Sequence, residues 1–286
     1  MDFDVGFFEE EVRCGYTVTA EMKRVWAVEL ELLALFDSIC KKHGLRYYVD
    51  YGTLLGAVRH HGFIPWDNDI DITMFRGEYQ KLKAVIQNEL EYPFFFQDSY
   101  TDPLRIMTLS KLQNLNTTAI EFPEMLGTEF HQGISIDIMP LDDVADGKRC
   151  SELITNMELA MWYGIVEPNI LHEDKGFSEI RRTLEGYLEL SVIERFGVFE
   201  EFCASQAGKS DTVNWLSWLF VYHKANRKKA WYEDIVYMPF ENMKVPCPAG
   251  YDEILKSCYG DYMTPVQGGS QHEGIILDAD RPYGSY

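Results

Sequence analysis

The sequence predicts an α+β fold with a mixed β-sheet core and a helical insert, and three observations support this. Residues 19–90 alternate between helical and strand-like spacings of apolar residues. Residues 93–140 are rich in strand-forming segments bounded by Asp, Asn, Pro and Gly. The composition then becomes helical. We therefore expect a core over 1–143, a helical insert over 144–232 on the acceptor side, and a hairpin, helix and tail over 233–286 packing on the core.

The composition argues against several classes of protein. The 286 residues include 46 acidic and 26 basic ones, a formal net charge of −20. Nucleic acid is therefore not expected as a partner, because phosphate backbones are bound by Lys and Arg. The acidic start, MDFDVGFFEEEVR, does not resemble a signal peptide, and no uncharged apolar stretch approaches the roughly 20 residues of a spanning helix. The six scattered cysteines are expected to be free thiols in a reducing cytoplasm.

The first predicted helix covers residues 19–43. Its apolar residues recur at steps of three and four and form a stripe that faces the core: Met22, Trp26, Leu30, Leu33, Phe36 and Cys40. Thr19 is expected to cap its start and Gly44 to end it. A strand over 45–52 should follow, and a second helix is expected over 78–90.

The most informative stretch is 50–78, DYGTLLGAVRHHGFIPWDNDIDITMFRGE. Residues two apart in a strand share a face, so Asp69, Asp71 and Thr73 are expected to face outward together and the isoleucines between them inward. Carboxylates held side by side repel each other unless a cation lies between them. This pattern predicts a Mg²⁺ or Mn²⁺ site, with Asp67 as a neighbouring acid.

A glycine-bracketed segment, GTLLG, precedes the acidic residues. We expect Gly52 and Thr53 to form a turn before a short helix at about 54–60. Backbone N–H groups at the start of a helix bind phosphate oxygens well. A metal site beside such a phosphate cradle predicts phosphoryl chemistry.

Two other interpretations of the acidic stretch remain open. The first is an ordinary edge strand whose polar face is solvated. The second is a calcium loop, because Asp67, Asp69, Asp71 and Glu78 fall on positions one, three, five and twelve of the EF-hand pattern. That pattern needs glycine at position six, where this chain has Ile72, a strand-forming residue.

The segment GTLLGAVRHHGFIPWDNDIDI resembles the signature of the LicD family of phosphocholine transferases, related to the fukutin group within the nucleotidyltransferase superfamily. The superfamily pattern is a Gly-Gly or Gly-Ser pair followed by a hydrophobic-Asp-hydrophobic-Asp strand. Here the pair is Gly52-Thr53, and the strand carries Asp69 and Asp71. The resemblance implies a nucleotidyltransferase-like core, and similar segments extend over most of the chain.

The resemblance also implies roles for residues further along. In GISIDIM, Asp137 leaves the row of core-facing isoleucines, and LicD-like proteins carry a third acid on such a strand. A surface acid on an edge strand is the alternative. Lys111 matches a basic residue of the family and is expected to hold a phosphate as a point charge. The family often has an arginine two residues later, where this chain has Gln113, so Arg59 and Arg105 are candidates for the second cationic contact.

Aromatic residues make up 14% of the chain, and Trp66 lies in the loop before the acids. A quaternary ammonium donates no hydrogen bond, so proteins select it with aromatic faces and nearby negative charge. We therefore expect Trp66 to form part of a wall that binds a choline head group.

The run VNWLSWLFVY, residues 213–222, contains no charge and is followed by a basic cluster. We assign it, with the residues up to 232, to a helical segment of the insert. The run is too short to span a bilayer. It is either core or a surface that meets a lipid-linked acceptor.

Taken together, the resemblance implies metal-dependent transfer of phosphocholine, or a similar phospho-alcohol, from CDP-choline or another CDP-alcohol. The acceptor would be a hydroxyl of a cell-surface glycan precursor, free or lipid-linked, such as teichoic acid or lipopolysaccharide. The expected location is cytoplasmic or the inner face of the membrane, with at most peripheral contact. The expected catalytic and metal-binding residues are Asp69, Asp71 and Asp137, and the expected substrate-binding residues are Gly52, Thr53, Arg59, Trp66 and Lys111.

Two alternative functions remain open. A true nucleotidyltransferase would leave the nucleoside monophosphate on the acceptor and release pyrophosphate. A binding protein of the same fold would catalyse neither reaction. The acidic residues do not separate the first alternative from phosphocholine transfer.

Overall fold

The structure is a computed structural model that describes residues 3–145, 189–217, 226–267 and 275–286. The chain divides into two compact units. The first comprises residues 1–97, 109–139 and 231–286, and the second comprises residues 98–108 and 140–230. The expected combination of helices with a mixed sheet is confirmed. The predicted boundaries after residues 143 and 232 stay a prediction, because much of the insert lies outside the described residues.

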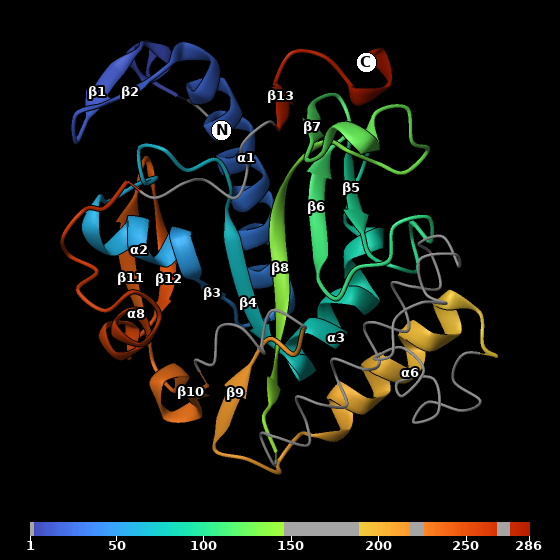
Figure 1. Ribbon diagram of the computed structural model, residues 1–286. Helices are drawn as coiled ribbons and strands as arrows, with labels where there is room; N and C mark the ends of the chain where they lie inside the picture. Colours follow the sequence, from blue (N-terminus) through green and yellow to red (C-terminus); the bar gives the residue numbers. More distant parts are fainter. Residues whose placement is uncertain (1–2, 146–188, 218–225, 268–274) are drawn as a thin grey trace, which may run out of the picture. The chain divides into compact units, whose positions relative to one another are not determined.

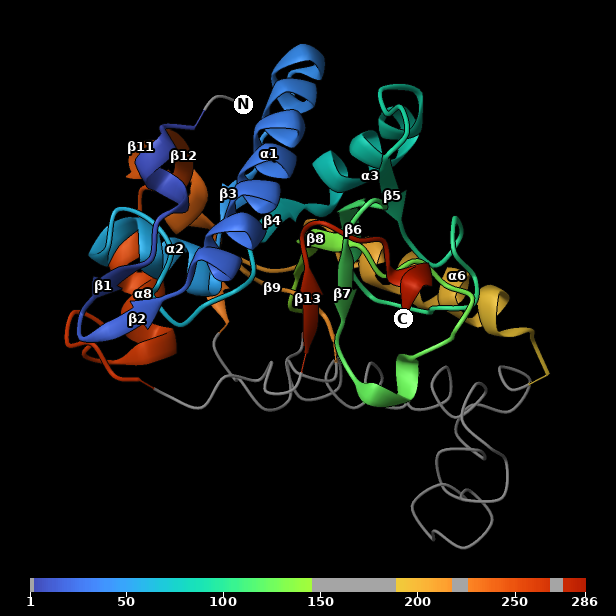
Figure 2. The same cartoon turned by 90° about the horizontal axis from the view of Figure 1, so that it is seen from above.

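The sheet of the first unit has the order β3-β4-β8-β6-β5. Its strands are β3 (Tyr48–Val49), β4 (Asp71–Phe75), β8 (Ile134–Asp143), β6 (Ser110–Asn114) and β5 (Phe94–Gln97). The β3–β4, β8–β6 and β6–β5 pairs are antiparallel. Helices α1 (Ala20–His43) and α3 (Arg76–Val85) lie on one face of this sheet, as Figures 1 and 2 show from two directions.

Smaller elements complete the first unit. Three two-stranded sheets are formed by β1 (Glu11–Arg13) with β2 (Tyr16–Val18), β11 (Ile235–Phe240) with β12 (Met243–Pro248), and β7 (Thr118–Ile120) with β13 (Ile276–Asp278). Two further helices are α2 (Tyr51–Arg59) and α8 (Tyr251–Tyr259). Short 3₁₀ turns cover Val5–Phe8, Ile86–Asn88, Pro123–Met125 and Tyr283–Ser285. The predicted C-terminal hairpin and helix are thus both present.

Helix α1 forms where the sequence predicts it. The Thr19 hydroxyl accepts a hydrogen bond from the Met22 amide at 3.2 Å, and Gly44 ends the helix with φ of 65°. The side chains of the apolar stripe from Trp26 to Cys40 are buried, while Met22 at its start is partly exposed. Burial of that stripe against the sheet is the main stabilisation of this helix, because isolated helices are only marginally stable in water.

The segment between α1 and β4 differs from the prediction. The expected strand over 45–52 is only two residues long, and α2 begins at Tyr51, before the expected start. The reason is Asp50, whose carboxylate accepts from the Tyr51 amide at 2.7 Å and whose carbonyl accepts from the Leu54 amide. Gly52 and Thr53 therefore lie in the first turn of α2, not in a turn before the helix.

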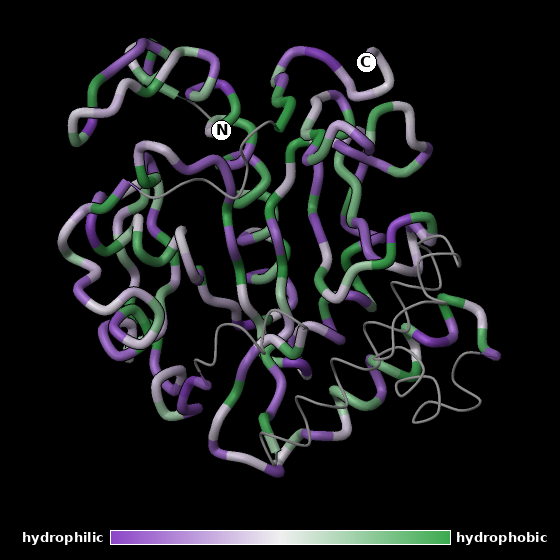
Figure 3. The backbone as a smooth tube through the Cα atoms, in the orientation of Figure 1, coloured by the Kyte–Doolittle hydropathy of each residue, from purple (hydrophilic) through white to green (hydrophobic). Residues whose placement is uncertain are grey.

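Strand β4 is covered on both faces over its central part. Successive side chains of a strand point to opposite faces, yet Ile72, Thr73 and Met74 are all 0% exposed. The expectation that Thr73 faces outward with Asp69 and Asp71 is therefore wrong. Polar and apolar residues still alternate along β4 and β8 (Figure 3), and the isoleucines of both strands are buried as predicted.

The second unit contains helix α6 (Val192–Ser205), which begins with a capping box between Ser191 and Glu194. Its core is formed by Ile106, Val144, Phe196, Phe199, Cys203 and Leu216. The last residues of β8 belong to this unit and pair with β9 (Thr212–Asn214), which pairs with β10 (Arg227–Lys228), before the 3₁₀ turn Lys229–Tyr232.

The helix expected over 213–232 is therefore wrong in its described part. Val213 and Asn214 lie opposite Asp143 and Asp142 of β8, so strand pairing replaces the helix. Val213 and Leu216 are buried, which places the start of the 213–222 run in a core. The rest of that run lies outside the described residues. Among the described helices, none has the length and apolar content needed to cross a membrane.

Substituting either of two helical glycines by alanine should change the free energy of unfolding, in opposite directions. A Cβ at Gly56 in α2 would overlap the Gly62 carbonyl, so Gly56→Ala should lower the free energy of unfolding by about 1–3 kcal/mol. A Cβ at Gly77 in α3 would meet nothing within 4 Å, so Gly77→Ala should raise it by about 0.5 kcal/mol. Urea denaturation of both variants measures this. Equal effects would show that α2 does not pack tightly against the loop that contains Gly62.

Candidate functional site

Strands β4 and β8 bring the predicted acids together. The Asp137 amide donates to the Ile70 carbonyl at 2.8 Å, so Asp137 lies beside the residue between Asp69 and Asp71. Ile70, Ile136 and their neighbours on the core-facing rows are buried, while the three aspartates remain partly exposed. The alternation in the two strands, with Asp69 just before β4, thus brings three carboxylates from two distant segments close to one another.

Lys111 lies directly opposite Asp137 in the β6–β8 pair. Its ammonium is 2.9 Å from Asp137 Oδ1 and 3.0 Å from Glu121 Oε1. The lysine expected to contact phosphate is therefore in the acidic site. Glu121, which follows β7, was not predicted, because nothing in the local sequence indicates that it meets Lys111.

The carboxylates of this site repel each other. Burial raises the pKa of Asp71 well above its usual range, and the charges of Asp69, Asp137, Asp67 and Asp50 raise it further. The pKa of Asp67 is likewise raised well above its usual range, by burial and then by the charge of Asp69 and a hydrogen bond with it. These carboxylates are costly to keep ionised without a cation.

The pKa of Asp137 is also raised, and burial is the main cause. The charge of Lys111 and its hydrogen bond lower the pKa of Asp137 and offset part of this rise, while the charges of Glu121 and Asp69 raise the pKa further. Lys111 is thus the cation that the folded protein itself supplies to this acid.

Gly52 and Thr53 reach the acids through the start of α2. A Cβ at Gly52 would lie 2.5 Å from Asp67 Oδ2, so only glycine admits that carboxylate against the first helical turn. The Thr53 hydroxyl accepts a hydrogen bond from the Asp71 amide at 2.8 Å. The two residues therefore position Asp67 and Asp71, and any contact with phosphate stays a prediction.

The backbone of Asp67 is fixed from the other side by α1. The Trp26 indole Nε1 donates to the Asp67 carbonyl at 3.0 Å, and its ring stacks on Phe63 with centroids 4.5 Å apart. The loop before β4 is thus held by a core side chain of α1 and is not a solvated connection.

Arg59 is not brought to the acids. It lies at the other end of α2, where Nη1 donates to the Tyr262 carbonyl at 2.7 Å and Nε to His60 Nε2 at 2.8 Å. Gln113 occupies the place of the family's second basic residue. Its side chain is buried, donates to the amide oxygen of Gln97 and accepts from the Gly133 amide at 2.9 Å. A charged residue at Gln113 would lose this amide network.

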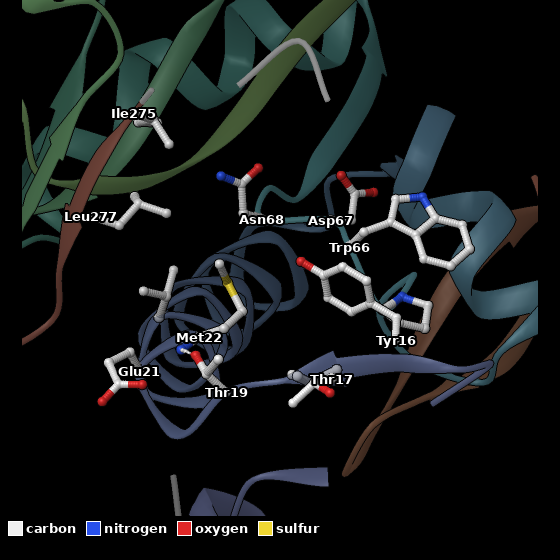
Figure 4. A pocket seen from close by; sticks show the side chains of 13 residues that line it. Tyr16, Thr17, Thr19, Glu21, Met22, Trp66, Asp67, Asn68, Ile275 and Leu277 are labelled. Carbon is white, nitrogen blue, oxygen red and sulfur yellow. Dashed lines mark hydrogen bonds between the residues drawn. The ribbon is translucent and has the colours of Figure 1, made fainter. Parts of the chain in front are cut away.

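Trp66 lies beside a pocket of about 370 Å³, shown in Figure 4. Its ring meets the ring of Tyr16 edge to face with centroids 6.0 Å apart. Asp67 and Asn68 also line this pocket, as do residues at the start of α1. The contribution of Tyr16 was missed, because no local pattern indicates that the N-terminal hairpin returns to the acidic loop.

Glu29 of α1 is a further acid that the sequence reasoning missed. Its side chain is 1% exposed, and within the described residues its Oε2 accepts no hydrogen bond. Burial and then the charges of Asp69, Asp67 and Asp137 raise its pKa well above the usual range. A signal was present, since Glu29 lies three residues after Trp26 and one before Leu30, inside the apolar stripe.

The acidic side chains of this site offer oxygen donors to a divalent cation. In the part of the chain that the structure describes, no group of three or more His, Cys, Asp or Glu side chains is arranged to hold a metal ion. The available donors are nevertheless carboxylate oxygens that repel each other, which suits Mg²⁺ or Mn²⁺. The chemistry of these residues therefore fits a hard cation, and binding would require their side chains to converge.

The calcium-loop interpretation is wrong. Residues 71–75 form a strand, whereas an EF-hand needs a continuous loop there. Glu78 lies in α3, where its carboxylate accepts from the Arg46 amide at 3.2 Å and pairs with Lys81 at 2.7 Å. It is therefore committed elsewhere.

Fold and site together define a mixed α/β protein whose central strands present carboxylates and a lysine suited to phosphate-group chemistry. Residues 44–143 match the family described as LicD/FKTN/FKRP, nucleotidyltransferase domain. The resemblance to the LicD family is thus confirmed, and the matched range contains every site residue that the sequence predicted.

Relatives support the same assignment. The chain is 24% identical over 241 residues to the lipopolysaccharide cholinephosphotransferase LicD of Haemophilus influenzae, covering 82% of this chain and 88% of that protein. It is 32% identical over 81 residues to the ribitol 5-phosphate transferase FKRP of Mus musculus and of Homo sapiens. That match covers 24% of this chain and 16% of each relative.

The raised pKa of Asp71 predicts how stability depends on pH. Below the unfolded pKa of about 3.9 both states are protonated and nothing is lost. As pH rises through the higher folded pKa, the native state must bear a buried charge and loses stability. In chelator, Asp71→Asn should therefore raise the midpoint of thermal unfolding at pH 7.5, and this gain should shrink as the pH falls towards 4.

Asp278→Asn is the control of opposite sign. Hydrogen bonds, first from Tyr286, lower the pKa of Asp278 to about 2, so its carboxylate stabilises the fold above the unfolded pKa. That variant should lose stability at pH 7.5, with the loss vanishing as pH falls through about 2. A destabilised Asp71→Asn at pH 7.5 would contradict the repulsion.

Proposed function

We propose that this chain transfers phosphocholine, or a similar phospho-alcohol, from a CDP-linked donor to a hydroxyl of a cell-surface glycan precursor such as lipopolysaccharide or teichoic acid. The broader class, an enzyme that transfers a phosphorus-containing group, is confirmed by the comparisons with LicD and FKRP. The donor, the metal and the acceptor belong to the proposal, as does a nucleotidyltransferase-like assignment of the core.

One observation carries the proposal. Asp69, Asp71 and Asp137, from two segments more than 60 residues apart, lie close to one another, with Lys111 opposite Asp137. Repelling carboxylates are costly, so a fold that gathers them is expected to use them on a cation and on phosphate. The intact set also argues against the catalytically silent binding protein.

The proposed roles follow from these positions. Asp69, Asp71 and Asp137 would hold Mg²⁺ or Mn²⁺. When bound, such a cation neutralises the donor's pyrophosphate and stabilises the departing CMP. Lys111 would neutralise charge that develops on the transferred phosphate. The first turn of α2, with Gly52 and Thr53, presents backbone N–H groups at a helix start next to the same acids.

Asp137 is also the proposed proton acceptor. The acceptor hydroxyl gives its proton to the Asp137 carboxylate, its oxygen bonds to the phosphorus that bears choline, and the bond from that phosphorus to CMP breaks. The raised pKa of Asp137 makes its carboxylate a better base than a surface aspartate. There is little covalent chemistry beyond this, so positioning and charge neutralisation dominate.

A cytoplasmic location is part of the proposal. Among the described residues, Cys14, Cys40 and Cys247 are free thiols, and Cys40 and Cys247 are buried. Free thiols persist in reducing compartments. Contact with a membrane, if the acceptor is lipid-linked, would be peripheral.

A true nucleotidyltransferase is the second candidate, favoured by the description of the matched family domain. Mass analysis of products separates the candidates. Purified protein with Mg²⁺, CDP-choline and a lipopolysaccharide acceptor should release CMP and add phosphocholine to the acceptor. Excess chelator or Asp71→Asn should abolish this. Pyrophosphate release from a nucleoside triphosphate would support the second candidate, and turnover in chelator would contradict the metal.

Asp67 and Asp69 are expected to differ in importance. Asp67 precedes the strand and lies against the start of α2, so we expect it to contact the metal through water at most. Asp67→Asn should retain at least about tenfold more activity than Asp69→Asn, on the order of 1.4 kcal/mol in the barrier. Initial rates of the two purified variants measure the ratio. Equal losses would make Asp67 a direct ligand.

A further inference from the structure

The pocket beside Trp66 opens next to the acidic site. It is built in the first unit from the N-terminal hairpin, the start of α1, the loop before β4, and β13. Asp67 belongs to both places, because it lines the pocket while its carboxylate is hydrogen-bonded to Asp69. A molecule with its phosphates at the aspartates therefore has this pocket within reach of its other end. The volume of about 370 Å³ suits a small head group.

Aromatic and apolar side chains form part of the pocket wall. Figure 4 shows the rings of Tyr16 and Trp66 near each other, with Met22 beside them and Leu277 across the pocket. The two rings are inclined by 71°, so they form a corner and not a stack. Two ring faces at such an angle contact a rounded cation from two sides.

The ionisable side chains that line the pocket are acidic. Asp67 and Glu21 line it, and among the described lining residues none is Lys, Arg or His. A polyol would need a hydrogen-bond partner for each of its hydroxyl groups. A trimethylammonium group needs no such partner, and it is attracted by both the ring faces and the carboxylates.

The aromatic corner is held in place before any ligand binds. Arg13, in the strand next to Tyr16, donates to the Glu241 carboxylate through Nη1 at 2.5 Å and Nη2 at 3.0 Å. Glu241 also accepts from the Phe63 amide at 3.1 Å, three residues before Trp66. One carboxylate thus ties the hairpin of Tyr16 to the loop of Trp66, which lowers the entropy cost of binding.

We propose that this pocket binds the quaternary ammonium head of the donor, with Tyr16 and Trp66 as its specificity-determining residues. The proposal rests on the proposed function, because it concerns how the same site binds the alcohol part of the donor. It adds the N-terminal hairpin to the substrate site, outside the family-matched residues 44–143. The pocket makes the enzyme select a charged alcohol over a neutral one.

Binding measurements test the proposal without turnover. Isothermal titration of the full chain in Mg²⁺ should give a lower Kd for CDP-choline than for CDP or CDP-ribitol. Tyr16→Ala and Trp66→Ala should each raise the Kd for CDP-choline by about 2- to 30-fold and leave the Kd for CDP unchanged. Tyr237→Ala, which removes an exposed ring on β11, is the matched control and should change neither value.

A second variant tests the charge and does not depend on the rings. Thr17 is exposed and lines the pocket, so Thr17→Lys puts an ammonium group there with little risk to folding. Thr17→Lys should raise the Kd for CDP-choline by about tenfold. Thr17→Gln, whose side chain is of similar length but uncharged, should leave this Kd unchanged. Binding of CDP-ribitol should not weaken in either variant.

The outcomes separate this proposal from the function on which it rests. Equal Kd values for CDP-choline and CDP in the unaltered protein would overturn the proposed role of the pocket without contradicting the proposed transferase function. An equal rise in the Kd values for CDP and CDP-choline in Tyr16→Ala would also overturn it, since the Tyr16 ring would then contact the nucleotide and not the choline head group. A chain that binds no CDP compound in Mg²⁺ would overturn the proposed function itself.

Discussion

The repulsion between carboxylates on one face of β4 and β8 is the constraint around which the first unit is built. Asp71 and Asp137 are drawn together by a backbone hydrogen bond at Ile70, and the pKa values of both are raised. Such an arrangement lowers stability, so it must be held by interactions elsewhere. The buried isoleucines of both strands provide this stabilisation. Their burial removes apolar area from water whether the acids are protonated or ionised.

Helices α1 and α2 hold the acids at their positions by different means. Helix α1 reaches the loop through the hydrogen bond from Trp26 to the Asp67 carbonyl. Helix α2 holds the start of β4 through the Thr53 hydroxyl and admits the Asp67 carboxylate at Gly52. The local conformation of this loop is therefore decided by three elements that pack on it. The backbone of this loop is thus fixed, and only its side chains would need to move to converge on a cation.

Under the proposed function, the acids and the pocket would divide the work of recognition. The acidic face, with Lys111, is suited to a cation and to phosphate, and the pyrophosphate is the part that all CDP-linked donors have in common. The corner of Tyr16 and Trp66 is suited to the part in which donors differ. The relatives are named for choline phosphate and for ribitol 5-phosphate, and the FKRP match covers only 24% of this chain.

Features that depend on the local spacing of apolar residues and on local capping could be predicted from the amino-acid sequence. The stripe and caps of α1, the C-terminal hairpin and the alternation that turns Asp137 away from the isoleucines were all predictable, because each depends on residues a few positions apart. The family signature added the role of Asp137 as a third acid and that of Lys111. Only the tertiary structure decided that Thr53 holds β4, that Glu29 lies near the acids, that residues 213–214 form a strand, and that Tyr16 meets Trp66. Each of these depends on contacts between distant segments, and the free energy of such contacts is set by the packing of whole elements and not by the residues next to them in the chain.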